Sequence, residues 1–240
     1  MRIPSLMTRS ACAAALGLAA LLAHGQSKDA RARVLLRKER MAAQFDTVNV
    51  VKNVVKANPL LFLRGEIPLY YERALTYRLS MEVGVGVTLR NYMAMTFMGD
   101  DADDFGAGTE IIPNLSYRIA ARFYLEDDLE PQGWYVQPEF GHLVYAKDIR
   151  EVGPNGVFTE VRYRDQRTFN DVRALLGYQM LSSSSNWLID VYGGVAFRDR
   201  NLRKVQENLD PATRLYTYKV VESNDIIPAF FLGVKVGVGF

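Results

Sequence analysis

The segment "PAFFLGVKVGVGF", residues 228 to 240, shows the pattern that decides the fold. From Phe230 onward, large apolar residues occupy every second position, and from Gly233 onward the residues between them are glycine or lysine. A period of two residues predicts a β-strand whose two faces meet different surroundings. The last residue of this strand is an aromatic one, Phe240.

The same alternation recurs along most of the chain. The stretches that show it are 54–63, 66–75, 80–89, 113–125, 133–146, the residues from 172 and the residues from 187. Together with the C-terminal segment they make eight strands. We therefore expect an all-β fold: an eight-stranded antiparallel up-and-down transmembrane β-barrel over residues 51–240.

The connections between these strands support a barrel. From the second connection onward they alternate between short and long, as even-stranded membrane barrels do. The short ones are 76–78, 126–133 and 182–186, and the long ones lie near 90–110, 148–166 and 199–226. Residues 64–66 are an exception, because a connection this short falls where a long one is expected.

The N-terminal 25 residues have the pattern of a cleaved signal peptide. Arg2 and Arg9 precede an apolar run from Ala11 to Ala23, and Ala23-His24-Gly25 offers a small-x-small cleavage site. The run is too short to span a bilayer. Residues 26–50 are basic and predict a short periplasmic segment, helical or disordered, with a membrane-surface helix as the alternative.

The composition limits the chemistry that the chain can carry. The 29 basic and 27 acidic residues leave a net charge of +2, too little to indicate a nucleic-acid partner. The single cysteine, Cys12, falls inside the expected signal peptide. The mature protein would then lack a disulfide, a thiol nucleophile and a thiolate metal site.

A period of two residues does not by itself separate a membrane barrel from a soluble sandwich or a lipocalin-like barrel. The polar face is rich in glycine and alanine, which suit a confined interior better than bulk water. Its five basic residues, Lys56, Arg118, Arg122, Arg173 and Lys235, are matched by five acidic ones. Charges in a narrow lumen must be paired, since an unpaired buried charge costs several kcal/mol.

We therefore expect a largely plugged lumen that is filled by a salt-bridge network. Its members are Glu72, Glu82, Arg118, Arg122, Glu139, Asp171, Arg173, Asp190 and Lys235.

Aromatic residues on the apolar face separate by barrel end. Trp134, Trp187, Tyr178 and Phe123 fall at the end with the short turns, as does Phe240, and they predict an aromatic girdle at a membrane interface. At the opposite end the sequence places Phe62, Phe169, Phe197 and Phe230.

Two segments resemble a family of uncharacterised outer-membrane β-barrels common in Bacteroidota, which are small barrels of the OmpA, OmpX or OmpW kind. The first segment carries Asn58, Pro59, Leu60 and Gly65, followed by Tyr71, Glu72, Arg73 and Leu75. The second carries Arg122, Phe123, Tyr124 and Leu125, followed by Gly133, Tyr135, Val136 and Pro138.

The likeness covers roughly residues 50–145, and Asn114 and Leu115 depart from the family's frequent Pro-Glu. It implies a bacterial outer-membrane location and no particular activity. It also implies that Phe240 is the signal read by the barrel assembly machinery. The partners expected are outer-membrane lipid, lipopolysaccharide, that machinery and an unknown surface ligand.

The sequence offers little catalytic or metal chemistry, and no cofactor is expected. The mature chain has one histidine, His142, with no serine within ten residues, and alternation turns it outward. Asp100, Asp101, Asp103 and Asp104 are oxygen ligands in one loop, but their spacing does not fit a calcium loop, and solvated loop acids are the simpler interpretation.

The sequence therefore favours a non-enzymatic outer-membrane barrel with a structural or surface-interaction role. Three alternatives stay open: an OmpW-like channel for small or hydrophobic solutes, a lipid A-modifying barrel enzyme centred on His142, and a soluble periplasmic barrel.

Overall fold

The structure, a computed structural model, describes residues 28–48, 50–93, 102–153, 155–182, 184–211 and 215–240. The expected signal peptide lies outside these residues. The chain separates into an N-terminal unit that ends at Ala43 and a second unit from Gln44 to Phe240. Helix α2 (Lys28–Thr47) contains this boundary. Among the described residues, no helix is both long enough and apolar enough to cross a membrane.

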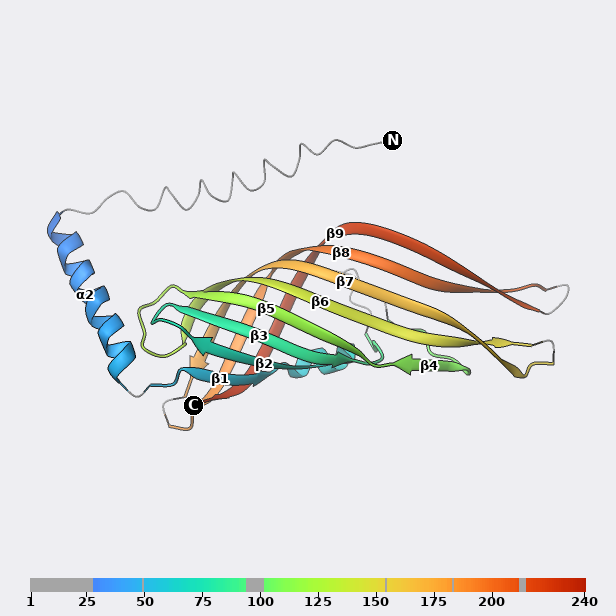
Figure 1. Ribbon diagram of the computed structural model, residues 1–240, viewed down its shortest axis with the longest axis horizontal. Coiled ribbons are helices and arrows are strands. Elements are labelled where there is room, and N and C mark those ends of the chain that lie inside the picture. The colour runs from blue at the N-terminus through green and yellow to red at the C-terminus, as the bar shows by residue number, and fades with distance from the viewer. Residues whose placement is uncertain (1–27, 49, 94–101, 154, 183, 212–214) are drawn as a thin grey trace, which may run out of the picture. The chain divides into compact units, whose positions relative to one another are not determined.

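The second unit is almost entirely antiparallel β-sheet (Figure 1). Its elements are β1 (Asn53–Ala57), the 3-10 helix η1 (Pro59–Arg64), β2 (Glu66–Ala74), β3 (Leu79–Thr88), β4 (Thr109–Ile112), β5 (Asn114–Tyr124), β6 (Gly133–Val152), β7 (Phe158–Leu181), β8 (Trp187–Leu209) and β9 (Tyr216–Gly239).

Eight of the described strands form a closed ring. Its order is β1–β2–β3–β5–β6–β7–β8–β9, and β9 returns to β1 through pairs such as Val55 with Val238. Closure gives every strand a neighbour on both sides, which removes the exposed sheet edge that would otherwise pair with other chains. The short strand β4 lies outside this circuit and pairs with β6 opposite Ala146–Ile149.

The two ends of the ring differ. The connections 75–78, 125–132 and 182–186 are short and lie at one end, which also holds Phe240. At that end the backbone amide of Phe240 donates to the carbonyl of Asn53 at 2.8 Å, so the first and last strands are joined there.

The expected strand 54–63 is wrong beyond Ala57. Pro59 has no backbone N–H to give to a ladder, and the chain turns into η1 instead. The Asn58 side chain accepts from the amide of Leu60 at 3.1 Å and begins this helix. Gly65 ends it with a positive φ of 71°. The connection between β1 and β2 is therefore 58–65, which resolves the exception noted at 64–66.

The long loops expected at 148–166 and 199–226 are also wrong, because most of these residues are strand. Strands β6 to β9 have 20 to 24 residues each, whereas β1, β2, β3 and β5 have 5 to 11. Pairing between β7 and β8 stops at Gln166 and Arg203. Beyond that point the described residues form a β6–β7 hairpin extension (147–153 and 155–165) and a β8–β9 hairpin extension (204–211 and 215–221).

The two hairpin extensions contact each other through aromatic rings. Tyr163 of the first stacks on Tyr218 of the second, with ring centroids 4.9 Å apart and planes 10° apart. The backbone amide of Val152 also donates to the Tyr218 hydroxyl at 3.0 Å. These contacts hold together two hairpins that no longer share a ladder.

Candidate functional site

The ring has an inverted distribution of polarity. Charged side chains such as Lys56, Arg122 and Asp190 point into the ring and are at most 1% exposed. Large apolar side chains on its outer face are open, with Phe197 70% and Leu115 74% exposed. The charged interior is therefore the feature on which any function of this chain has to be built.

We call the end of the ring with the short turns the lower end. The interior near this end holds a cluster that we call the basal network. Each of the eight ring strands contributes one polar side chain to it. In strand order these are Lys56, Glu72, Glu82, Arg122, Gln137, Gln179, Asp190 and Lys235.

Contacts within the basal network are dense, and its three cations balance its three carboxylates. Arg122 reaches Asp190 at 2.7 Å, Glu82 at 2.8 Å and Glu72 at 3.2 Å. The Lys56 ammonium lies 2.9 Å from Glu82 and 3.4 Å from Asp190, and it also pairs with Glu72. The buried charges are thereby compensated, as a low-dielectric interior demands.

Buried tyrosines donate hydrogen bonds to two of the three carboxylates of this network. The Tyr124 hydroxyl donates to Glu72 at 2.7 Å, and the Tyr135 hydroxyl donates to Asp190 at 2.5 Å. The guanidinium of Arg122 lies 4.1 Å from the centre of the Tyr135 ring, within the range of a cation–π interaction.

A second cluster, the upper network, lies further along the strands. Its members are Glu66, Arg118, Glu139, Asp171, Arg173 and Arg198, again three cations and three carboxylates. Arg118 pairs with Glu66 at 2.5 Å, and Arg173 pairs with Glu139 at 2.8 Å and with Asp171 at 2.6 Å. Arg198 holds the same Asp171 at 2.7 Å. The amide of Gln137 donates to Glu139 at 2.8 Å and so connects the two networks.

An apolar layer follows above the upper network. Leu143, Tyr145, Phe169 and Leu202 form one buried cluster, with Phe169 0% exposed. The expectation that Phe169 belongs to the apolar outer face is therefore wrong, because it shares the inward parity of Asp171 and Arg173 on β7.

A polar cavity lies beyond this layer. It has a volume of about 790 Å³ and is lined by residues 102–107 and by residues of β6, β7 and β8. Lys147, Asp165 and Arg167 line its strand side. The interior thus changes from filled to hollow where the hairpin extensions begin.

All nine residues of the expected salt-bridge network lie inside the ring and in ion pairs, but they belong to two networks instead of one. Lys235 pairs with Glu82 at 2.5 Å. Gln137 and Gln179 were not predicted from the sequence, because the network was inferred from charged residues alone and amides carry no charge. Their inward parity on β6 and β7 was the signal that could have identified them.

Glycines on the inner face make room for this filling. The ring of Tyr135 fills the space where a side chain at Gly177 would lie. Tyr192 does the same at Gly233, and Tyr70 at Gly84. A side chain at any of these glycines would collide with the ring on the neighbouring strand.

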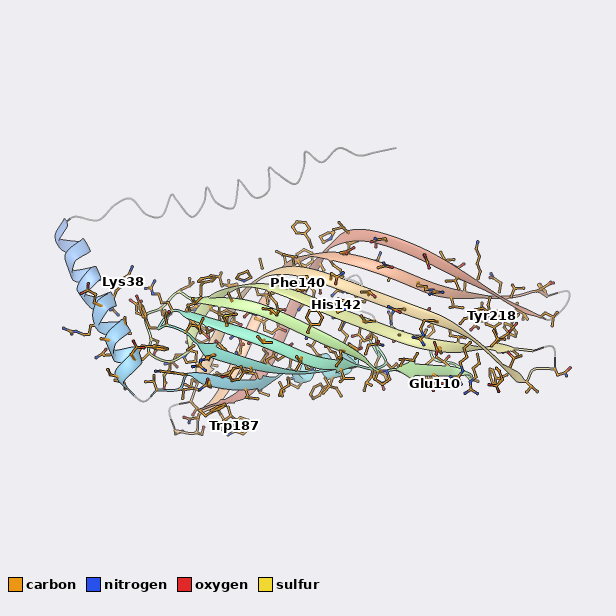
Figure 2. The ribbon with its side chains drawn as sticks, viewed as in Figure 1. Lys38, Glu110, Phe140, His142, Trp187 and Tyr218 are labelled. Atoms are coloured by element: carbon orange, nitrogen blue, oxygen red, sulfur yellow. The ribbon has the colours of Figure 1, made fainter. Side chains whose placement is uncertain are left out.

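The residues of the expected aromatic girdle are all exposed on the outer face, near the short turns. Their exposures range from 37% for Tyr178 to 63% for Phe240. Trp134 and Tyr178 are cross-strand partners with ring centroids 5.2 Å apart. Figure 2 shows Trp187 at the same end of the second unit.

His142 faces outward on β6, as does Phe140 on the same strand (Figure 2). Its ring stacks on Tyr117 with centroids 4.9 Å apart, and its Nδ1 lies 2.7 Å from the Asn170 side-chain oxygen. Asn170 in turn donates to Asp199 at 3.3 Å. These four residues form a polar row across β5, β6, β7 and β8, above the apolar outer face.

One residue of the acidic loop contributes to the interior. Asp103 pairs with Arg167 and accepts from the Asn91 amide at 2.8 Å. Asp100 and Asp101 lie outside the described residues, and Asp104 is exposed. No group of three or more His, Cys, Asp or Glu side chains among the described residues is arranged to hold a metal ion.

Comparison with known proteins returned no matching family model, no matching curated protein and no matching solved structure.

Proposed function

We propose that this chain is a bacterial outer-membrane β-barrel whose lumen is closed by ion pairs and whose hairpin extensions form a surface for interaction outside the cell. The observation that carries the proposal is the inverted polarity of the ring. Soluble proteins bury their apolar side chains and seldom bury a charge. A lipid environment favours the opposite arrangement, with an apolar outer band around a polar interior.

The size of the apolar outer band supports this membrane topology. Outward residues are apolar over Leu115–Phe123 on β5, Val172–Met180 on β7 and Trp187–Phe197 on β8. These runs of nine to eleven residues have the length that a tilted strand needs to cross a hydrocarbon core. The aromatic residues at the lower edge and the polar row of His142 at the upper edge suit the two interfaces.

The interior supports a closed barrel over an open channel. Two charged networks and an apolar layer lie in succession between the short turns and the cavity, so a solute that enters the cavity meets three filled levels. The hairpin extensions support a role in surface interaction, since they expose apolar residues at their ends, including Val157 at 68% and Leu209 at 53%.

A matched pair of arginine substitutions tests the membrane location. Leu176 and Val161 both lie on β7 and are 49% and 47% exposed, but only Leu176 lies in the apolar band. In a membrane, Leu176→Arg should cost about 2–4 kcal/mol of folding free energy, whereas Val161→Arg should cost little. In a soluble protein, both should be tolerated equally.

The measurement is fractionation of the cell envelope combined with a gel that compares boiled and unboiled samples. The wild-type protein and Val161→Arg should remain in the outer-membrane fraction and migrate differently when unboiled. Recovery of the wild-type protein in the soluble fraction without detergent would overturn the proposal.

A further inference from the structure

The cavity above the apolar layer contains two charges that do not follow the pairing rule of the rest of the interior. Lys147 on β6 and Asp165 on β7 are direct cross-strand partners. Both residues line the cavity, and each is 8% exposed. Among the residues that the structure describes, no ion pair joins these two side chains, and neither has an ion pair with any other residue.

Each of the two side chains has one hydrogen bond with the backbone. The Lys147 ammonium donates to the carbonyl oxygen of Asp104 at 2.8 Å, and Asp165 accepts from the amide of Val205 at 3.2 Å. An ammonium has three donors and a carboxylate has about four acceptor positions. Both groups therefore keep most of their hydrogen-bonding capacity for an occupant of the cavity.

The charges of Arg167 and of the two networks are paired, so the lack of ion pairs at Lys147 and Asp165 stands out. Arg167, two residues from Asp165, pairs with Asp103 across the same cavity, and the networks below compensate every charge that they contain. A buried charge without a partner costs several kcal/mol. Lys147 and Asp165 face the cavity side by side, one positive and one negative, so the contents of the cavity must solvate them.

We propose that this cavity binds a small zwitterion, with its anionic group on Lys147 and its cationic group on Asp165. A ligand of this class supplies both missing charges in one molecule and leaves the net charge of the site unchanged. The volume of about 790 Å³ falls within the usual range of pockets for small ligands, roughly 300–1,000 Å³. That a solute would arrive from outside the cell rests on the proposed membrane topology; the binding itself does not.

The test uses three probes of similar size on the full-length protein, folded in a non-ionic detergent because a zwitterionic one would compete. Glycylglycine has both charges, N-acetylglycine has only the carboxylate, and glycylglycinamide has only the ammonium. Isothermal titration calorimetry should detect binding of glycylglycine. The two singly charged probes should bind at least about tenfold more weakly, because each loses a hydrogen bond between charged groups.

Two variants locate the site. Lys147→Met and Asp165→Asn should each weaken glycylglycine binding about tenfold or more. Lys219→Met and Glu160→Gln remove exposed charges of the hairpin extensions that do not line the cavity, and these variants should bind as the wild-type protein does. Asp165→Asn nearly preserves the shape of the side chain, and the unboiled gel shows whether each variant is folded.

The inference is overturned if glycylglycine does not bind, if the singly charged probes bind equally well, or if both cavity variants keep the wild-type affinity. Each of these results leaves the membrane location to be decided by the Leu176→Arg comparison, so the two proposals fail separately.

Discussion

Tyr135 occupies the space that Gly177 leaves open on the neighbouring strand, and its hydroxyl reaches Asp190 from there. Gly177→Ala would place a methyl group against the tyrosine ring, and overpacking of this kind costs about 1–3 kcal/mol. We expect a lower urea midpoint for this variant in phospholipid vesicles. Gly106→Ala is the control, since no atom lies within 4 Å of the added methyl. Equal midpoints for the two variants would contradict this packing.

Single charges in the basal network should matter more than single charges at the surface. Lys56→Met leaves Glu72, Glu82 and Asp190 without one of their cations, and breaking a buried pair in this way costs about 3–5 kcal/mol. The control is Arg203→Met, which removes an exposed pair with Glu222 at 3.8 Å and should cost about 0–1 kcal/mol. Equilibrium unfolding in vesicles measures both, and a Lys56→Met variant as stable as the control would refute the interpretation.

The direction in which the charged side chains of the two networks point could be predicted from the sequence, but their partners could not. Alternation placed Glu82, Arg118 and Lys235 inside the ring. The division into two networks depends on how far each strand is shifted along its neighbour, as in the pairing of Asp190 with Lys235. This stagger is a property of the closed ring and has no local signal in the sequence.

At the scale of elements, strands could be predicted from the sequence only as far as the apolar outer face extends. Residues 158–168 and 199–209 have polar side chains on both faces, so the period of two residues disappears although the hydrogen-bond ladder continues. The same limit applies to η1. Asn58, Pro59 and Gly65 belong to the motif on which the family resemblance rests, and their physical role as the start and end of a 3-10 helix appears only in the structure.

The stability of the β8–β9 hairpin extension at its base should depend on pH. Arg200 binds both carboxylate oxygens of Asp225, at 2.9 and 2.6 Å, and this holds the pKa of Asp225 below its ordinary value. A lowered pKa stabilises the folded form above the unfolded pKa of about 3.9. This stabilisation is lost as the pH falls through the folded pKa.

An NMR titration of the Asp225 carboxyl carbon measures this effect. The midpoint should lie below about 3.9 in the wild-type protein and should rise in the Arg200→Gln variant. If both proteins titrate at the same pH, the pair does not stabilise the hairpin.

At the scale of the whole molecule, the filled interior predicts that the protein does not conduct ions. The two networks and the layer around Phe169 leave no continuous polar path from the cavity to the short-turn end. We expect no steady conductance when the purified protein is inserted into planar bilayers. A stable open level would instead favour the channel alternative for small solutes.

The composition of the basal network has a consequence for how the ring closes. Lys56 lies on the first strand and Lys235 on the last, and Lys235 meets Glu82 across 153 positions of sequence. A sheet that has not yet closed would hold these charges without their partners, and a register slip of one residue would turn Lys235 outward. Because six of the eight strands supply these charges and must be in register before the charges cancel, we expect the network to penalise incomplete or misaligned assemblies and to make closure an all-or-none event.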